Sequence, residues 1–73
     1  MEPKKGYYRH FKGNIYQVLY IAKHSESLCD LVIYKSVKED KIWARPLDMW
    51  LETVERDGKI MPRFSYIGEE YED

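Results

Sequence analysis

Short runs of alternating hydrophobic and polar residues follow one another along this chain, separated by residues typical of turns. The strongest run covers residues 15–22. One of its faces carries Ile15, Gln17, Leu19 and Ile21, and the other carries Tyr16, Val18, Tyr20 and Ala22. Because both faces are mostly apolar, the run predicts a central strand that is at least partly covered on both sides. A helix is the alternative, but β-branched and aromatic residues dominate, which favours the strand.

Further runs predict short strands at residues 7–11, 30–36, 42–45, 52–56 and 59–61. Asp57 and Gly58 form the two-residue turn of a hairpin between the last two of these runs. Residues 46–50 predict a single helical turn, since Pro46 has the fixed φ that suits a first helical position. Pro62 interrupts the last strand and predicts an edge or a bulge, after which Phe64, Tyr66 and Ile67 are expected to return to the core.

Five to six short strands within 73 residues favour one antiparallel sheet that bends back on itself. Closing such a sheet buries its inner face and removes its edges. The predicted fold class is therefore all-β, a small SH3-like antiparallel barrel with at most one short helical turn. An OB-like barrel and an α+β roll are the alternatives. The predicted organisation is a flexible N-terminus at 1–5, a single barrel domain at 6–68 and an acidic tail at 69–73.

The formal net charge of −1 is unevenly distributed. Residues 69–73 carry four of the 13 acidic side chains, which leaves 12 basic and 9 acidic groups, a charge of +3, in residues 1–68. This is a modest charge for a dedicated nucleic-acid binder. The tail is expected to be solvated and frayed, and the alternative is that it folds back over a basic face and competes with a ligand there.

Cys29 is the single cysteine, so the chain has no internal disulfide, and a lone thiol suits a reducing cytosol. Cys29 has no neighbouring cation in the sequence and is interpreted as an inert, half-buried residue. No apolar segment follows Lys4 and Lys5, and no apolar run reaches the length of a membrane span. These features predict a soluble cytoplasmic protein.

The sequence contains two groups of residues that could form a reactive site, a hydrolase-like triad and a metal site. Ser25 lies between His24 and Glu26, as in a hydrolase, but adjacent residues of an extended segment point in different directions. Ser25 and Glu26 are therefore expected to cap a turn, and His24 is expected to cover the mouth of the barrel. A metal site would have to combine His10, His24, Cys29 and Glu26 or Asp30 without any paired-ligand spacing. No catalytic residue, metal or cofactor is therefore predicted.

Arginines near aromatic residues form the remaining candidate chemistry: Arg9, Arg45 and Arg63 with Tyr7, Tyr8, Trp43, Trp50 and Phe64. Guanidinium groups stack on rings and donate paired hydrogen bonds to phosphate or carboxylate, so this combination suits an anionic peptide or single-stranded nucleic acid. In the structural alternative, Arg45 and Arg63 pair with Asp48, Glu52 or Glu55 inside the fold, while the rings fill the core.

An ordered set of segments resembles the DUF1653 family of small bacterial proteins, over about residues 6–67. The set comprises Gly6-Tyr7-Tyr8-Arg9-His10-Phe11-Lys12-Gly13, Tyr16-Gln17-Val18-Leu19, Ala22-Lys23-His24-Ser25-Glu26, Leu31-Val32-Ile33-Tyr34, Trp43-Ala44-Arg45-Pro46-Leu47 and Pro62-Arg63-Phe64. The resemblance implies an SH3-like barrel and no particular activity, since the family has no assigned function. The family pattern is often acidic after His-Ser-Glu, where this chain has Leu28 and Cys29, and this difference argues against a carboxylate cage in that loop.

Together these observations predict a non-enzymatic binding module, a monomer or weak homodimer that does not associate with membranes. Its expected partner is an anionic ligand, a peptide or a nucleic acid. The alternatives are a single-stranded nucleic-acid binder and a small enzyme that uses His10 or His24. The candidate ligand-binding residues form one predicted rim: Tyr8, Arg9, His10, His24, Glu26, Trp43, Arg45 and Arg63.

Overall fold

The computed structural model describes residues 3–71. In order, the elements of this part are β1 (Gly6–His10), β2 (Ile15–Lys23), β3 (Asp30–Ser36), β4 (Ile42–Pro46), α1 (Leu47–Trp50), β5 (Thr53–Arg56), β6 (Lys59–Pro62) and β7 (Phe64–Gly68). Every strand pair is antiparallel, so the all-β class with one short helical turn is confirmed. The described residues contain seven strands instead of five to six, because the chain bends at Arg63 and β7 begins as a separate strand.

Two predicted regions extend beyond the described residues. Residues 1–2 of the expected flexible N-terminus and residues 72–73 of the acidic tail lie outside them. Within the described part of the tail, the ring of Tyr71 lies 5.7 Å from that of Tyr7 on β1. None of the helices in residues 3–71 is long and apolar enough to cross a membrane.

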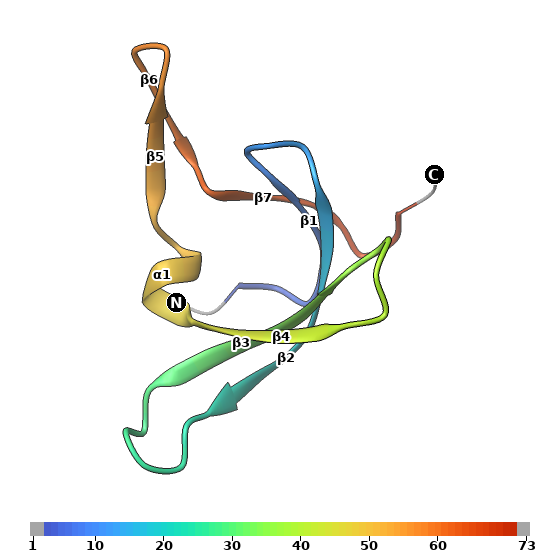
Figure 1. Cartoon of the computed structure of the whole chain (residues 1–73), viewed down its shortest axis with the longest axis vertical. Coiled ribbons are helices and arrows are strands. Elements are labelled where there is room, and N and C mark those ends of the chain that lie inside the picture. Colours follow the sequence, from blue (N-terminus) through green and yellow to red (C-terminus); the bar gives the residue numbers. More distant parts are fainter. Residues whose placement is uncertain (1–2, 72–73) are drawn as a thin grey trace.

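The main sheet has the strand order β4-β3-β2-β1-β7, and β5 and β6 form a separate hairpin that projects from it (Figure 1). The predicted central position of β2 is confirmed. Its alternation is interrupted by a register shift between Val18 and Tyr20. As a result, Val18 and Ile21 both lie toward the core, although simple alternation would place them on opposite faces. Tyr20 is 63% exposed, so the expected cover on both faces of β2 is incomplete.

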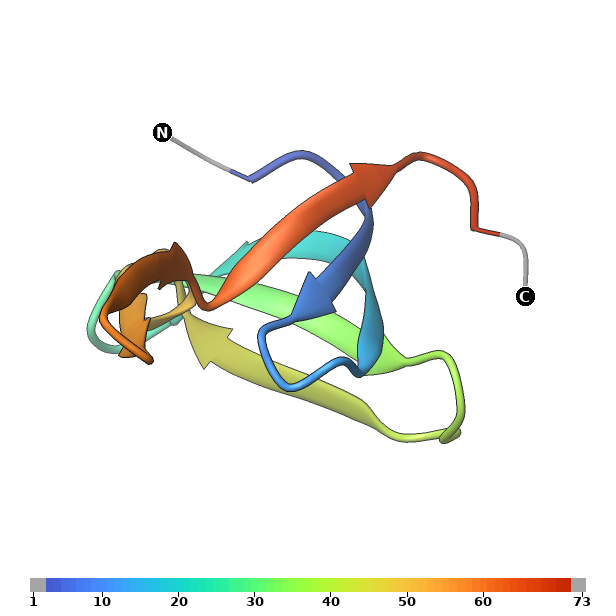
Figure 2. The same ribbon diagram turned by 90° about the horizontal axis from the view of Figure 1, so that it is seen from above.

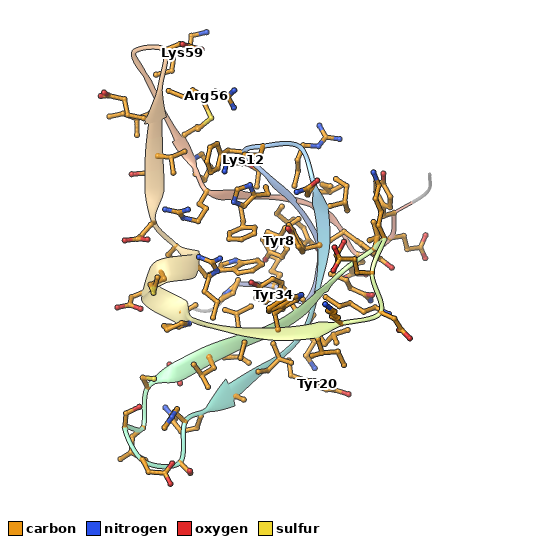
Figure 3. All side chains as sticks on the ribbon, in the orientation of Figure 1. Tyr8, Lys12, Tyr20, Tyr34, Arg56 and Lys59 are labelled. Carbon is orange, nitrogen blue, oxygen red and sulfur yellow. The ribbon has the colours of Figure 1, made fainter. Side chains whose placement is uncertain are left out.

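The core lies on the concave side of the curved sheet, which Figure 2 shows from above. Its buried residues are Tyr8, Val18, Val32, Tyr34, Trp50 and Phe64. The Trp50 ring stacks on Phe64 with 3.7 Å between centroids, and meets Tyr8 and Tyr34 edge-on at 5.4 Å and 5.0 Å. Figure 3 shows Tyr8 and Tyr34 directed into this interior and Tyr20 directed away from it. Two side chains expected in the core, Tyr66 and Ile67, are instead 41% and 40% exposed, because β7 is an edge strand.

The predicted closure into a barrel is not confirmed, because β4 and β7 are the two ends of an open sheet and do not pair with each other. Residues 47–63 connect them through α1 and the β5–β6 hairpin. The two edge strands instead approach each other through side chains. The guanidinium carbon of Arg45 on β4 lies 5.7 Å from the ring centre of Phe64 on β7. We call this opening between β4 and β7 the seam.

Candidate functional site

Cationic side chains gather around His10 near the seam. His10 ends β1, Lys12 lies in the following turn, Arg45 belongs to β4, and Arg63 lies between β6 and β7. We call these four residues the cationic cluster. The ring of Phe64 joins two members, because it meets His10 edge-on at 5.0 Å and lies below the Arg45 guanidinium. Three separate parts of the sequence therefore bring positive charge to one place.

The two arginines of the cluster have few partners. Arg63 Nη2 lies 3.6 Å from Glu52 Oε1, and the backbone N–H of Arg63 donates to the Glu52 carbonyl. The predicted pairing of Arg63 with Glu52 thus exists, at the long end of ion-pair distances. Within residues 3–71, Arg45 forms no ion pair with an acidic side chain. The Nε atoms of both arginines are buried without a hydrogen-bond partner in this part of the chain, so the cluster holds unneutralised positive charge.

The positive charge of these side chains affects the protonation of His10. Its Nδ1 accepts a hydrogen bond from the backbone N–H of Lys12 at 3.2 Å, so the neutral ring carries its proton on Nε2. Burial lowers the pKa of His10 below its ordinary value of 6.5, and repulsion by Arg63, Lys12 and Arg45 lowers the pKa further. At neutral pH the ring is therefore an uncharged donor among cations.

We expect the imidazole of His10 to titrate below pH 6.5 in an NMR titration of its Cε1–H signal, and to titrate closer to 6.5 in the Arg63→Gln variant. Between the folded pKa and 6.5 the unfolded chain binds more protons than the native protein. The free energy of unfolding contributed by His10 therefore falls as the pH is lowered through 6.5 and stops falling below the folded pKa. An unchanged midpoint in Arg63→Gln would contradict the placement of Arg63 charge at His10.

A pocket of about 250 Å³ adjoins the cluster at Arg45. Its other lining residues are Tyr16, Tyr34, Ser36, Glu39 and Trp43. Trp43 lies opposite Tyr34 in the β3–β4 register and is 47% exposed, so its ring forms an accessible wall. The sequence did not indicate Tyr16 and Tyr34 as site residues. Only the register of β2, β3 and β4 brings these rings beside Arg45.

The eight residues of the predicted rim do not form one surface. His10, Trp43, Arg45 and Arg63 lie at the cluster or its pocket. Tyr8 is only 5% exposed and donates its hydroxyl hydrogen to the Lys4 carbonyl at 2.7 Å. Arg9 is exposed on the other face of β1, because side chains alternate along the strand between Tyr8 and His10.

His24 and Glu26 lie in the β2–β3 loop, at the opposite end of β2 from the turn that contains Lys12 (Figure 1). The nine residues of β2 separate these loops by roughly 30 Å. His24 Nδ1 accepts the N–H groups of Glu26 at 3.1 Å and Ser27 at 3.2 Å, and the Ser25 hydroxyl donates to the Glu26 carboxylate. The imidazole thus stabilises its own turn, whereas the sequence predicted that His24 covers the mouth of a barrel.

The other titratable groups of that loop make no additional site. Residues 3–71 contain no group of three His, Cys, Asp or Glu side chains placed to hold a metal ion. Cys29 is exposed, whereas the sequence indicated a half-buried thiol. Cys29 is the last residue of the β2–β3 loop, directly before β3 begins at Asp30 as predicted.

Comparisons with known proteins give a consistent result. Residues 6–66 match the model of the family described as "Protein of unknown function (DUF1653)". Among solved structures, the chain is similar to the crystal structure of a DUF1653 protein from Bordetella bronchiseptica, with a TM-score of 0.87 and 31% sequence identity over 97% of this chain and 95% of that one. No curated protein matches the chain.

Proposed function

This chain belongs to the DUF1653 family, whose function is unknown, and on that premise we propose that it is a non-enzymatic module that binds an anionic partner at the cationic cluster. Arg45 and Arg63 bind the anionic group, and Trp43 with Tyr16 contacts an attached ring. The observation that carries the proposal is that His10 and Arg45 meet at the Phe64 ring, with Arg63 and Lys12 adjacent. Within residues 3–71, the one ion pair of these cations joins Arg63 to Glu52 at 3.6 Å.

Three physical features support binding over a purely structural role. The Arg45 guanidinium lies over the Phe64 ring, which holds it in place without neutralising it. The neutral His10 adds a hydrogen-bond donor on Nε2 without requiring a second anion. The adjacent pocket of about 250 Å³ is lined by three rings as well as by Ser36 and Glu39, and has room for a small planar group.

The proposal predicts that phenyl phosphate binds more tightly than inorganic phosphate, because its ring contacts Trp43 and Tyr16 while its phosphate pairs with the arginines. In two-dimensional NMR titrations we expect shifts at the Trp43 indole N–H and the His10 ring. A charge-assisted hydrogen bond contributes about 1.5–3 kcal/mol, so Arg45→Gln and Arg63→Gln should each weaken binding about tenfold or more.

Arg56→Gln is the matched control, since Arg56 is exposed at the tip of the β5–β6 hairpin, away from the core (Figure 3). It should bind phenyl phosphate like the unchanged chain. Equal losses in all three arginine variants, or no shift at the cluster, would contradict the proposal.

A single-stranded nucleic acid is the second candidate, because the exposed Trp43 ring beside Arg45 suits base stacking next to a phosphate. An oligothymidylate titrated under the same conditions separates the two candidates. Binding to nucleic acid would weaken linearly with the logarithm of salt concentration and would exceed that of phenyl phosphate.

The cellular setting is part of the same proposal. An exposed single thiol, Cys29, suits a reducing bacterial cytoplasm, and the structural relative comes from a bacterium. An SH3-like class for the fold is supported by the curl of the sheet and by the Arg45–Phe64 contact across the seam.

A further inference from the structure

The edge strand β4 is open to pairing. It is the first strand of the main sheet and pairs only with β3 among the described residues. No further backbone hydrogen bond of residues 3–71 reaches Ile42–Pro46. Ile42 and Trp43 on this strand are 66% and 47% exposed. An exposed, apolar edge of this kind is a template for another strand.

The other edge, β7, is less suited to such pairing. Its register with β1 shifts between Tyr7 and Tyr8, which twists the strand locally. Glu69 and Glu70 follow its end and would repel a second acidic copy. By contrast, β4 pairs with β3 without a register shift from Ile42 to Pro46.

We propose that β4 pairs antiparallel with β4 of a second copy of this chain, about a two-fold axis at Ala44. In that register Trp43 lies opposite Arg45 of the second copy, and Ile42 lies opposite Pro46 of the second copy. Directly opposite side chains in an antiparallel pair are close enough for ring–cation and apolar contacts. A two-fold contact forms each of these pairs twice.

The sequence of β4 favours a second copy over an unrelated strand. The small side chain of Ala44 lies where two copies approach most closely, so the axis is not obstructed. Arg45 already lies 5.7 Å from the Phe64 ring, and Trp43 of the second copy would supply a ring on its other side. Pro46 has no N–H to donate and is tolerated on an edge strand.

The outer face of the sheet would add apolar contacts between the two copies. Tyr20, Ile33 and Ala44 are aligned across β2, β3 and β4 by the observed register. Because this row ends at Ala44, two rows would meet at the axis and form one apolar strip across both sheets. Tyr20, 63% exposed, lies at the outer end of the row. The inference rests on strand register and exposure and does not require the proposed anion binding, although Trp43 and Arg45 belong to both surfaces.

Sedimentation of the full chain without ligand tests the inference. The mass should rise with concentration from 8.9 kDa toward twice that value. Ala44→Lys places two ammonium groups face to face at the axis and should raise the dissociation constant about tenfold or more. Ile60→Lys is the matched control, because Ile60 is an apolar residue 73% exposed on β6; its dissociation constant should not change.

Hydrogen exchange provides a second measurement on the unchanged chain. Amide exchange in β4 should slow as the concentration rises, while exchange in the β5–β6 hairpin should not. A mass of 8.9 kDa at every concentration would overturn the inference. So would association that Ala44→Lys leaves intact, or growth beyond a dimer, which would indicate head-to-tail pairing of β4 with β7.

Discussion

Replacing Trp50 with alanine is expected to lower the free energy of unfolding by about 3–5 kcal/mol. Trp50 is only 2% exposed, stacks on Phe64 at 3.7 Å and meets Tyr8 and Tyr34 edge-on. Its removal would leave a cavity between the sheet and α1 that these rings are too constrained to fill. At about 0.05–0.15 kcal/mol per residue, the 73-residue chain has a total stability of only about 4–11 kcal/mol, so much of the protein would unfold.

Urea titration followed by circular dichroism measures this loss. Trp43→Ala is the matched control, because the same side chain is removed from a position that is 47% exposed. Its cost should stay below about 1 kcal/mol, as for most exposed positions. Similar midpoints for the two variants would mean that the Trp50–Phe64 stack does not organise the core.

Gly6→Ala should cost nearly as much, from two sources. Gly6 has a φ of +135°, a conformation that costs an alanine about 1–3 kcal/mol. Gly6 is also buried, and an added Cβ would lie 2.7 Å from the Gly68 carbonyl oxygen and 3.1 Å from Tyr66 Cε1. Both atoms belong to residues of β7, which pairs with β1, so the two strands would have to move apart at a further cost of about 1–3 kcal/mol.

Gly13→Ala separates the two sources. Gly13 has a φ of +105°, and no atom lies within 4 Å of a Cβ built there. This variant therefore carries the backbone cost without the contact. We expect thermal or urea unfolding to show Gly6→Ala as the less stable variant by about 1–3 kcal/mol. Equal losses would indicate that β7 moves aside freely at Gly68.

Much of the fold followed from local patterns. The alternation in residues 15–22, the Asp57-Gly58 turn and the position of Pro46 before α1 each specify conformation through neighbouring residues, and all three elements are present. The shift of register after Val18 was not predictable, because a bulge depends on the partner strand as well as on its own residues. The exposure of Tyr66 and Ile67 likewise depends on β7 having a neighbour on one side only.

The sequence indicated the types of residue in the candidate site, but it did not indicate all of the individual residues that lie there. The structure places His10 and Arg45 at the Phe64 ring, next to Arg63, and Trp43 lies beside Arg45, while their role in binding stays a prediction. Because side chains alternate along β1, Arg9 lies on the opposite face from His10. Because β2 is nine residues long, His24 lies in the β2–β3 loop, far from the cationic cluster. Tyr16 and Tyr34 reach the site only because β2, β3 and β4 pair with one another. The spacing of residues along a single sequence does not reveal which strands pair.

The pairing of β1 with both β2 and β7 has a consequence for folding during synthesis. Phe64 lies against one face of Trp50, and among the strands of residues 3–71 β7 is the last to leave the ribosome. A nascent chain that ends before Phe64 therefore contains β1 to β6 but lacks a completed core. Since contacts between such distant residues form slowly, the final collapse should take milliseconds to seconds and should follow release of the last strand.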